Sequence, residues 1–582
     1  MTEHADVIEN TLVIPIPSSD QLVLDDYRRL TGPGLLWEEA GAVIDVLTGD
    51  FRATDVINQW NAEIHRILTA VGWEEQKSIH RTYDGGISLA ISAPMDQLYS
   101  AMFAVQTAWH FCAGTLLGER VGNFSAMAQD LQNVMAREAN PSLLALIKAA
   151  SEHDVDILCD DDDLSLGHGI GSRTWSVMDL PAPEDVDWSS LYDVPVALIT
   201  GTNGKTTTTR LSAAIGKAAG KVSGLTSTEF VRVGEDILDH GDYSGPGGGR
   251  MVLRDQRLEI AYLEVARGGI LRRGLPLRRA RVAVITNVAA DHLGQYGVNT
   301  VEELAVAKFA VHRALTEDGV LVLNADDPYV LAEAANTQAT IWWFSLDRDN
   351  SKIEEFRNNG MPCSWLDGDS VVFFDGTAKT PIINVQDIPL ALGGAARYNI
   401  GNAMAAVCVS RAMGIDDMAI RKGLSEFQSD PRDNPGRCNE FTVRGARVFV
   451  DFAHNPHSIS AITQAMGAIP ANRRFIMLSH AGDRSDQDIR DVTNSAFALN
   501  PDFVMAVELP DYLRGRELGE ITTLITEECR SQGLADSHIL TGNTPTEGAA
   551  HILELLQSGD LALLLVLSER DAIFDLLENA NE

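Results

Sequence analysis

The chain has 582 residues, with 82 Asp and Glu against 46 Lys and Arg, so its formal net charge is −36. A surface this acidic repels nucleic acid and anionic lipid, so we expect no nucleic-acid partner and no membrane partner. One hydrophobic core does not extend over this length, so we expect several domains. The first residues lack a signal-peptide pattern and the six cysteines form no CxxC pair, which favours a cytoplasmic location.

Residues 1–190 contain no motif that indicates a reaction. They mix short apolar runs with helical patterns, of which the clearest covers residues 140–154. A stretch rich in proline and acidic residues follows at 180–195 and is typical of a linker. We therefore expect an α+β N-terminal domain over residues 1–190 whose role the sequence does not reveal.

From residue 194 onward, buried apolar runs alternate with amphipathic helical segments. This alternation is typical of a parallel sheet with helices on both faces. A β-rich patch and a helix over 399–414 follow, and a second alternation of strands and helices begins near residue 431. The predicted fold class is α/β: a central parallel-sheet domain with a phosphate loop (191–430), then a C-terminal Rossmann-like domain (431–582).

The segment "VPVALITGTNGKTTTTR" joins a predicted strand to a predicted helix through a glycine-rich turn. It is a shortened phosphate loop, because the first glycine of the full G-x-x-x-x-G-K-[ST] pattern is replaced by Ile199. Backbone N–H groups and the start of the helix attract phosphate. Lys205 is expected to reach the β- and γ-phosphates and the Thr206 hydroxyl to coordinate Mg²⁺. The alternative is an ordinary turn with a lysine facing solvent.

Two further predicted strands end in residues suited to a metal site. Glu264 ends the run "IAYLEV", and Asp291 and His292 follow the run "VAVITNV". In an open α/β sheet, ligands bind at the carboxyl ends of strands, which is where these side chains fall. Taken singly, such an acid is also common as a helix cap, and a lone histidine is often structural.

Lys308 falls on a predicted apolar helical face shared with Val301, Leu304, Val311 and Leu315. Its ammonium either extends from the core edge to solvent or is held inward, where burial lowers the pKa of the amine and makes it reactive toward CO₂. The pattern alone favours neither interpretation.

Nine motifs in order resemble the ATP-dependent Mur ligases, and most closely the C-terminal half of cyanophycin synthetases. The resemblance covers the chain from residue 194 to its end, about two thirds of its length, and implies a ligase of the same fold. The motifs are "GTNGKTTT", "LEVARGG", "TNVAADHL", the inward Lys308, "LNADDP", "YNIGNAMAA", "NPGR", "VDFAHNP" and "GDRSDQDIR".

The resemblance implies roles for individual residues. Lys205, Glu264, His292 and Lys308 are expected to be catalytic, with Lys308 carbamylated. Two Mg²⁺ ions are expected, held by Thr206, Glu264 and His292. The residues expected to bind ATP are Gly201, Thr202, Asn203, Gly204, Lys205, Thr206, Thr207, Asn399, Arg437, Asp451 and His454. The residues expected near the substrates are Arg267, Asp483, Arg484 and Arg514.

The sequence also departs from that of cyanophycin synthetases. Residues 1–190 resemble the N-terminal region of those enzymes, and 163–175 resemble the sequence that opens their ATP-grasp module. About twenty residues later the chain has reached its phosphate loop, so the ATP-grasp module is expected to be absent. A separate ATP-grasp partner enzyme is therefore one expectation.

The resemblance implies an ADP-forming ligase that joins an amine to a substrate carboxylate through an acyl phosphate. The carboxylate is expected on an acidic amino acid or peptide, and the enzyme is expected to be a homo-oligomer. One alternative is a phosphate-loop kinase or NTPase that forms no amide. Others are a catalytically silent nucleotide-binding scaffold, and a subunit that receives ammonia from an amidotransferase.

Overall fold

The computed structural model describes residues 7–17 and 19–580 and divides into two compact units. The first unit contains residues 7–288, 292–343 and 408–415, and the second contains 289–291, 344–407 and 416–580. Each unit is described by itself below.

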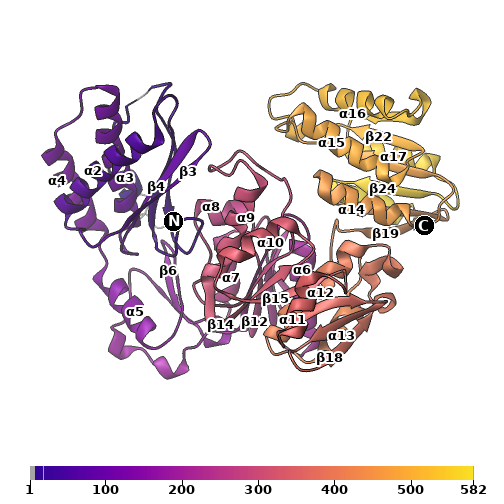
Figure 1. The fold of residues 1–582 in the computed structure, drawn as a ribbon, viewed down its shortest axis with the longest axis horizontal. Helices are drawn as coiled ribbons and strands as arrows, with labels where there is room; N and C mark the ends of the chain where they lie inside the picture. Colours follow the sequence, from indigo (N-terminus) through magenta and orange to yellow (C-terminus); the bar gives the residue numbers. More distant parts are fainter. Residues whose placement is uncertain (1–6, 18, 581–582) are drawn as a thin grey trace. The chain divides into compact units, whose positions relative to one another are not determined.

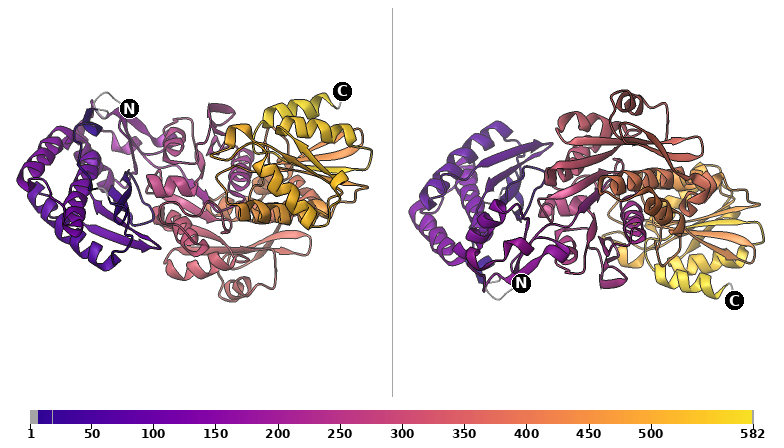
Figure 2. Two further views of the ribbon diagram at one scale, coloured as in Figure 1. Left: turned by 90° about the horizontal axis from the view of Figure 1, so that it is seen from above. Right: turned by 90° about the horizontal axis from the view of Figure 1, so that it is seen from below.

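The first unit begins with a four-stranded antiparallel sheet in the order β1-β2-β4-β3. Helices α2 and α3 pack on this sheet and α4 packs against both of them; Figures 1 and 2 show these helices on one side of the sheet. The inward side chains of these helices share one core, in which Trp60 and Trp109 are fully buried. The elements are β1 (Val23–Leu30), β2 (Gly41–Leu47), α2 (Ala53–Val71), β3 (Ser78–Tyr83), β4 (Gly86–Ser92), α3 (Leu98–Leu117) and α4 (Phe124–Glu138).

A small second layer follows, built from α5 (Pro141–Glu152) and the antiparallel strands β5 (Ile157–Cys159), β6 (Asp163–Leu166) and β7 (Arg173–Ser176). The helix predicted at 140–154 is confirmed. Residues 180–195, expected as a linker, instead form two 3₁₀ turns and place Val186 and Leu191 in the core of this layer. Apolar side chains in the proline-rich stretch explain the difference, because they can be buried there.

The central sheet of the first unit has the strand order β11-β10-β9-β12-β8-β13-β14. Strands β9, β12, β8, β13 and β14 are parallel, and β10 and β11 extend the edge in antiparallel fashion. The strands are β8 (Val196–Thr200), β9 (Ser223–Thr226), β10 (Phe230–Val233), β11 (Asp236–His240), β12 (Ile260–Glu264), β13 (Ala280–Ile285) and β14 (Leu315–Asn324). The helices are α6 (Lys205–Ala218), α7 (Pro246–Leu253), α8 (Arg267–Arg272), α9 (Val301–Phe309) and α10 (Pro328–Glu333).

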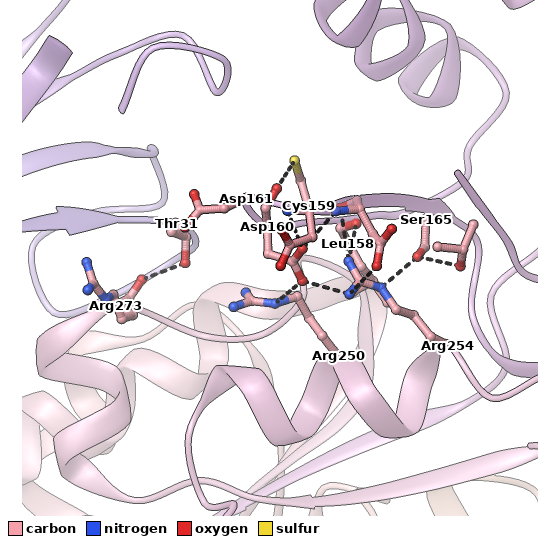
Figure 3. A network of polar contacts seen from close by, with 12 residues as sticks. Thr31, Leu158, Cys159, Asp160, Asp161, Ser165, Arg250, Arg254 and Arg273 are labelled. Atoms are coloured by element: carbon pink, nitrogen blue, oxygen red, sulfur yellow. Dashed lines mark hydrogen bonds and ion pairs between the residues drawn. The ribbon is translucent and has the colours of Figure 1, made fainter. Parts of the chain in front are cut away.

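Ion pairs and a backbone hydrogen bond attach the N-terminal sheet and the small β5–β7 layer to this central domain. Figure 3 shows Arg250 of α7 and Arg254, directly after it, reaching Asp160 in the β5–β6 turn. The N···O distances are 3.5 Å from Arg250 and 2.7 Å from Arg254. The backbone N–H of Thr31 donates to the carbonyl of Arg273 at 2.8 Å. The N-terminal domain is therefore fixed to the helices α7 and α8 that lie beside the central sheet.

The second unit holds an antiparallel set of strands in the order β16-β17-β18 and a separate six-stranded sheet in the order β19-β20-β24-β21-β22-β23. The last five strands of the six-stranded sheet are parallel. The cores of this sheet place α14, α15 and α16 on one face and α17 and α18 on the other. This doubly wound arrangement is the predicted Rossmann-like fold.

The elements from β15 onward have the following bounds: β15 (Thr340–Ser345), α11 (Ser351–Asn358), β16 (Cys363–Asp367), β17 (Ser370–Phe374), β18 (Lys379–Asn384), α12 (Arg397–Ala412), α13 (Asp417–Glu426), β19 (Asn439–Val443), β20 (Ala446–Asp451), α14 (Pro456–Gly467), β21 (Arg474–Leu478), α15 (Asp486–Ala496), β22 (Phe503–Val507), α16 (Glu520–Ser531), β23 (Ile539–Gly542), α17 (Pro545–Leu555), β24 (Leu561–Leu565) and α18 (Arg570–Asn579). Among the described residues, no helix is both long and apolar enough to span a bilayer.

Candidate active site

The phosphate loop lies between the carboxyl end of β8 and the start of α6, as predicted. Gly201 has a φ of +148°, and a Cβ built there would lie 1.9 Å from the Thr286 Oγ1 atom. Gly204 precedes α6 with a φ of +84°, in the left-handed region that favours glycine. Both glycines are therefore required by the path of the loop. The N-terminus of α6, a helix of 14 residues, opens onto it.

Thr286 and Asn287, directly after β13, attach the loop to the neighbouring strand, and the sequence alone predicted no role for either. The N–H of Thr202 donates to the Asn287 carbonyl at 2.8 Å, and the N–H of Asn203 donates to the Asn287 Oδ1 atom at 2.9 Å. The Thr286 hydroxyl donates to the Asn203 carbonyl at 2.6 Å. The sequence signal for this role is that Thr286 and Asn287 are polar and directly follow the apolar run "VAVI". These contacts fix the path of the loop beside β13.

Two lysines meet at one carbonyl oxygen of this loop. Lys205 donates to the carbonyls of Gly201 and Thr202 at 3.1 and 2.9 Å. Lys308 is only 4% exposed and donates to the Gly201 carbonyl at 2.8 Å. The inward orientation of Lys308 thus replaces the alternative of a solvent-facing ammonium. The Lys205 ammonium beside a phosphate loop favours a highly charged anion.

The helix predicted to carry Lys308 is shorter than the sequence pattern indicated. α9 ends at Phe309, residues 310–314 form a 3₁₀ turn, and Leu315 begins β14. The expectation that Leu315 shares a helical face with Lys308 is therefore wrong. Leu315 pairs with Ala280 in the sheet, and that pairing overrides the helical periodicity. Leu304 and Val311 are buried, as predicted.

Glu264 ends β12, and its strand register lies opposite Ile199 of β8, two residues before the phosphate loop. It is 2% exposed, and its N–H donates to the Thr226 hydroxyl at 3.0 Å. A carboxylate on this strand and the Thr206 hydroxyl at the start of α6 are hard oxygen donors, the type that Mg²⁺ prefers. The donor set of the first unit therefore fits Mg²⁺ beside a phosphate.

His292 lies in the loop after β13, is exposed, and has a φ of +50°. Arg267, at the start of α8, donates from Nη1 to the His292 carbonyl and from Nη2 to the Gln295 side chain, the latter at 2.7 Å. The guanidinium of Arg267 is thus engaged with the His292 loop. This contact gives Arg267 a structural task beside the substrate role expected from the sequence.

In the second unit, Arg437, Asp451 and His454 gather around Phe452. The Arg437 guanidinium lies 4.9 Å from the centre of the Phe452 ring, and the His454 ring packs edge-on to it. Asp451 ends β20 and accepts N–H bonds from Cys438 at 2.8 Å and Ala453 at 2.7 Å. Burial raises the pKa of the Asp451 carboxyl to about 6, although the nearby Arg437 acts in the opposite direction.

Asn399 lies in the first turn of α12 and is 2% exposed. Its side chain donates to the Leu390 carbonyl and accepts from the Asn402 amide, both at 3.1 Å. The side-chain amide of Asn399 is therefore held in one orientation by its neighbours.

The loop after β21 is joined to the loop after β22. Asp483 accepts from Arg514 Nη1 at 2.6 Å, and Arg516 donates to the carbonyl of Arg484 at 2.7 Å. His480 lies at the start of the loop after β21 and is buried, which lowers the pKa of its imidazole to about 4. The predicted residues Asp483, Arg484 and Arg514 are thus brought together at the carboxyl edge of the second unit's sheet.

Comparisons with known proteins agree with this fold. Residues 199–410 match the Mur ligase middle domain, and residues 436–570 match the Mur ligase glutamate ligase domain. The cyanophycin synthetase of Crocosphaera subtropica is 37% identical over 402 residues, which cover 68% of this chain and 45% of that protein. The chain thus spans less than half the length of that relative.

Two further proteins are similar over most of their own length. The UDP-N-acetylmuramate–L-alanine ligase of Xanthomonas axonopodis pv. citri is 29% identical, covering 63% of this chain and 70% of that protein. The solved structure of E. coli FolC in complex with ADP is 20% identical, covers 66% of this chain and 88% of its own, and has a TM-score of 0.49.

Together the two family matches cover more than half of the chain, and its class is that of α/β proteins with a central phosphate-loop domain and a Rossmann-like C-terminal domain. Within that class the chain belongs to the Mur ligase family, whose middle and C-terminal domains it carries. Members of this family use ATP and Mg²⁺.

Proposed function

We propose that this protein is an ADP-forming ligase that activates a substrate carboxylate as an acyl phosphate and joins it to an amine. The observation that supports this most strongly is the convergence of Lys205 and Lys308 on the Gly201 carbonyl of a phosphate loop bordered by buried Glu264. The residues proposed to bind the triphosphate are Gly201, Thr202, Asn203, Gly204, Lys205, Thr206 and Thr207.

In the proposed reaction, a carboxylate oxygen attacks the γ-phosphorus of ATP and ADP leaves. Lys205 offsets the charge that develops on the transferred phosphoryl group. The amine then attacks the acyl carbon, loses a proton and displaces inorganic phosphate. Bound Mg²⁺, for which Thr206, Glu264 and His292 are the proposed ligands, supplies charge neutralisation for the phosphates.

Lys308 is proposed to be carbamylated. Its amine is buried beside the Gly201 carbonyl that Lys205 also contacts, so an ammonium there adds repulsion to a site that must also hold Mg²⁺. Reaction of the neutral amine with CO₂ releases a proton and yields an anion. That anion can orient the ion and its water.

The second unit is proposed to hold the nucleoside and the amine. Asn399, Arg437, Asp451 and His454 are the candidates for adenine and ribose, and the clustering of three of them around Phe452 supports this assignment. Asp483, Arg484 and Arg514 are the candidates for the amine substrate. Asp483 is the proposed ligand for a cationic amine because its carboxylate lies at the sheet's carboxyl edge.

The similarity to cyanophycin synthetase suggests the substrate class, an acidic amino acid or peptide as the carboxylate and an amino acid as the amine. The test is phosphate release from ATP across a panel of acidic amino acids, acidic peptides and amines, with mass spectrometry of the products. We expect release to require both partners and to yield an amide. A phosphorylated product without an amide would favour a kinase, and nucleotide binding without turnover would favour a scaffold.

A further inference from the structure

The His292 loop, residues 292–300, folds as a tight turn that needs external support. The N–H of Gly294 donates to the Val298 carbonyl at 2.9 Å, and the N–H of Val298 donates to the Gln295 carbonyl at 3.1 Å. Two non-glycine residues in it, His292 and Tyr296, have φ values of +50° and +54°. Such conformations persist only where the surrounding structure holds them.

The N-terminal domain supplies that support through Arg81 of β3. Arg81 Nη2 donates to the carbonyls of Tyr296 and Gly297, at 2.9 and 2.7 Å. Its side chain is 20% exposed. Burial lowers the pKa of the guanidinium, although the nearby Glu303 carboxylate acts in the opposite direction.

The same guanidinium also faces the helix that carries Lys308. Arg81 Nη1 lies 3.8 Å from the Glu303 carboxylate. Glu303 forms the capping box of α9 with Thr300 and also accepts from the N–H of Asn299 at 2.7 Å. Arg81 therefore contacts the end of the His292 loop and the first turn of α9 at once.

Further contacts from the N-terminal sheet surround Arg81. The Arg28 guanidinium lies 4.8 Å from the centre of the Tyr296 ring and donates to the Leu271 carbonyl at 2.9 Å. A Cβ on Gly297, whose φ is +63°, would lie 2.3 Å from the Tyr83 ring. The loop thus packs against the sheet without space for a larger residue at Gly297.

We propose that Arg81 is a positioning residue of the ligase site, through which the N-terminal domain fixes both His292 and Lys308. The inference rests on the proposed roles of these two residues. It gives residues 1–190 a task in the reaction: they hold the metal-binding loop in place, so that Mg²⁺ and nucleotide bind to a site already formed. Supporting residues of this kind change metal affinity by about 10- to 100-fold when they are removed.

The test compares Arg81→Gln with the matched control Arg29→Gln in the full chain. Arg29 is an arginine of the same sheet, with a side chain 12% exposed. It pairs with Asp161 at 2.7 Å and lies over the Tyr99 ring, and both of these partners lie outside the His292 loop. The first readout is hydrogen exchange of residues 292–303 without nucleotide or metal. The second is the Mg²⁺ concentration that half-saturates binding of a fluorescent ATP analogue.

We expect Arg81→Gln to speed exchange in 292–303 and to raise the half-saturating Mg²⁺ concentration by about tenfold, with both unchanged in Arg29→Gln. Unchanged exchange in Arg81→Gln would overturn the proposal, as would faster exchange with unchanged Mg²⁺ dependence. If Arg81→Gln does not fold, Arg81→Lys replaces it, because lysine keeps the charge but lacks the planar fork of donors. Nucleotide binding that persists without amide formation would reject the proposed function alone, since both readouts are independent of turnover.

Discussion

The carboxyl edge of the central sheet in the first unit and that of the Rossmann-like sheet in the second are built in different ways. The first presents backbone: Gly201 and Gly204 shape the loop, and the side chains of Thr286 and Asn287 tie its amides and carbonyls to the next strand. The second is fixed by side chains, with Asp451 capping its own turn and Asp483 paired to Arg514. Backbone N–H groups and a helix N-terminus suit phosphate whatever its substituent, whereas side chains can distinguish one ligand from another.

Removing the Lys205 charge at the carboxyl edge of the central sheet is expected to have the largest effect on activity. Lys205→Ala should lower ADP formation by at least about 10³-fold, because the cation on the transferred phosphoryl group is lost. Steady-state ADP release checks this prediction. Most of the wild-type rate surviving in Lys205→Ala would remove the phosphate loop from the reaction.

Lys308→Ala is expected to have the second-largest effect. The rate of ADP formation should fall by about 10²-fold or more, because the proposed carbamate no longer orients the metal. A short carboxylate such as formate or acetate should restore part of the rate by occupying the space left. Mass spectrometry of the intact wild-type chain under CO₂ should show the added carbamate. Full activity of Lys308→Ala in CO₂-free buffer would leave Lys308 as a structural residue of the loop.

Gly201→Ala tests the backbone of the phosphate loop without changing any charge. The new Cβ would meet the Thr286 hydroxyl at 1.9 Å, so the loop must shift and nucleotide affinity should fall by about tenfold or more. Gly401→Ala is the control, because a Cβ at Gly401 has open space around it. Isothermal titration with a non-hydrolysable ATP analogue measures both. Equal affinities in the two variants would show that the loop tolerates a side chain.

The stability of the second unit should depend on pH through His480, which lies at the carboxyl edge of its sheet. His480 has a folded-state pKa of about 4, against an ordinary value of 6.5, chiefly because it is buried. The unfolded chain therefore binds a proton more tightly, and this group lowers stability as the pH falls from 6.5 toward 4. His480→Gln should become more stable relative to the wild type over that range, by up to about 3 kcal/mol. Urea unfolding at pH 7 and pH 5 tests it, and a pH-independent difference would contradict it.

The sequence predicted the local parts of the site well, because each depends on a few neighbouring residues. The strand–loop–helix around Lys205 follows from turn chemistry, whereas periodicity left two orientations open for Lys308 and only the family resemblance favoured the inward one. The roles of Thr286 and Asn287 in holding the loop could not be predicted, since they depend on the register of β13 beside β8. The contacts of Arg81 with the His292 loop could not be predicted either, because these partners lie more than two hundred residues away in the chain. Leu315 was misassigned because strand pairing outweighed a helical pattern.

Isotope transfer tests directly whether the carboxylate is activated as an acyl phosphate before it is joined to the amine. The carboxylate substrate identified in the panel is labelled with oxygen-18 and incubated with ATP, Mg²⁺ and the amine. We expect one oxygen-18 atom in the released phosphate for each amide formed, because the carboxylate oxygen that attacks phosphorus leaves with it. Amide formation with unlabelled phosphate, or phosphate release without amide, would contradict it.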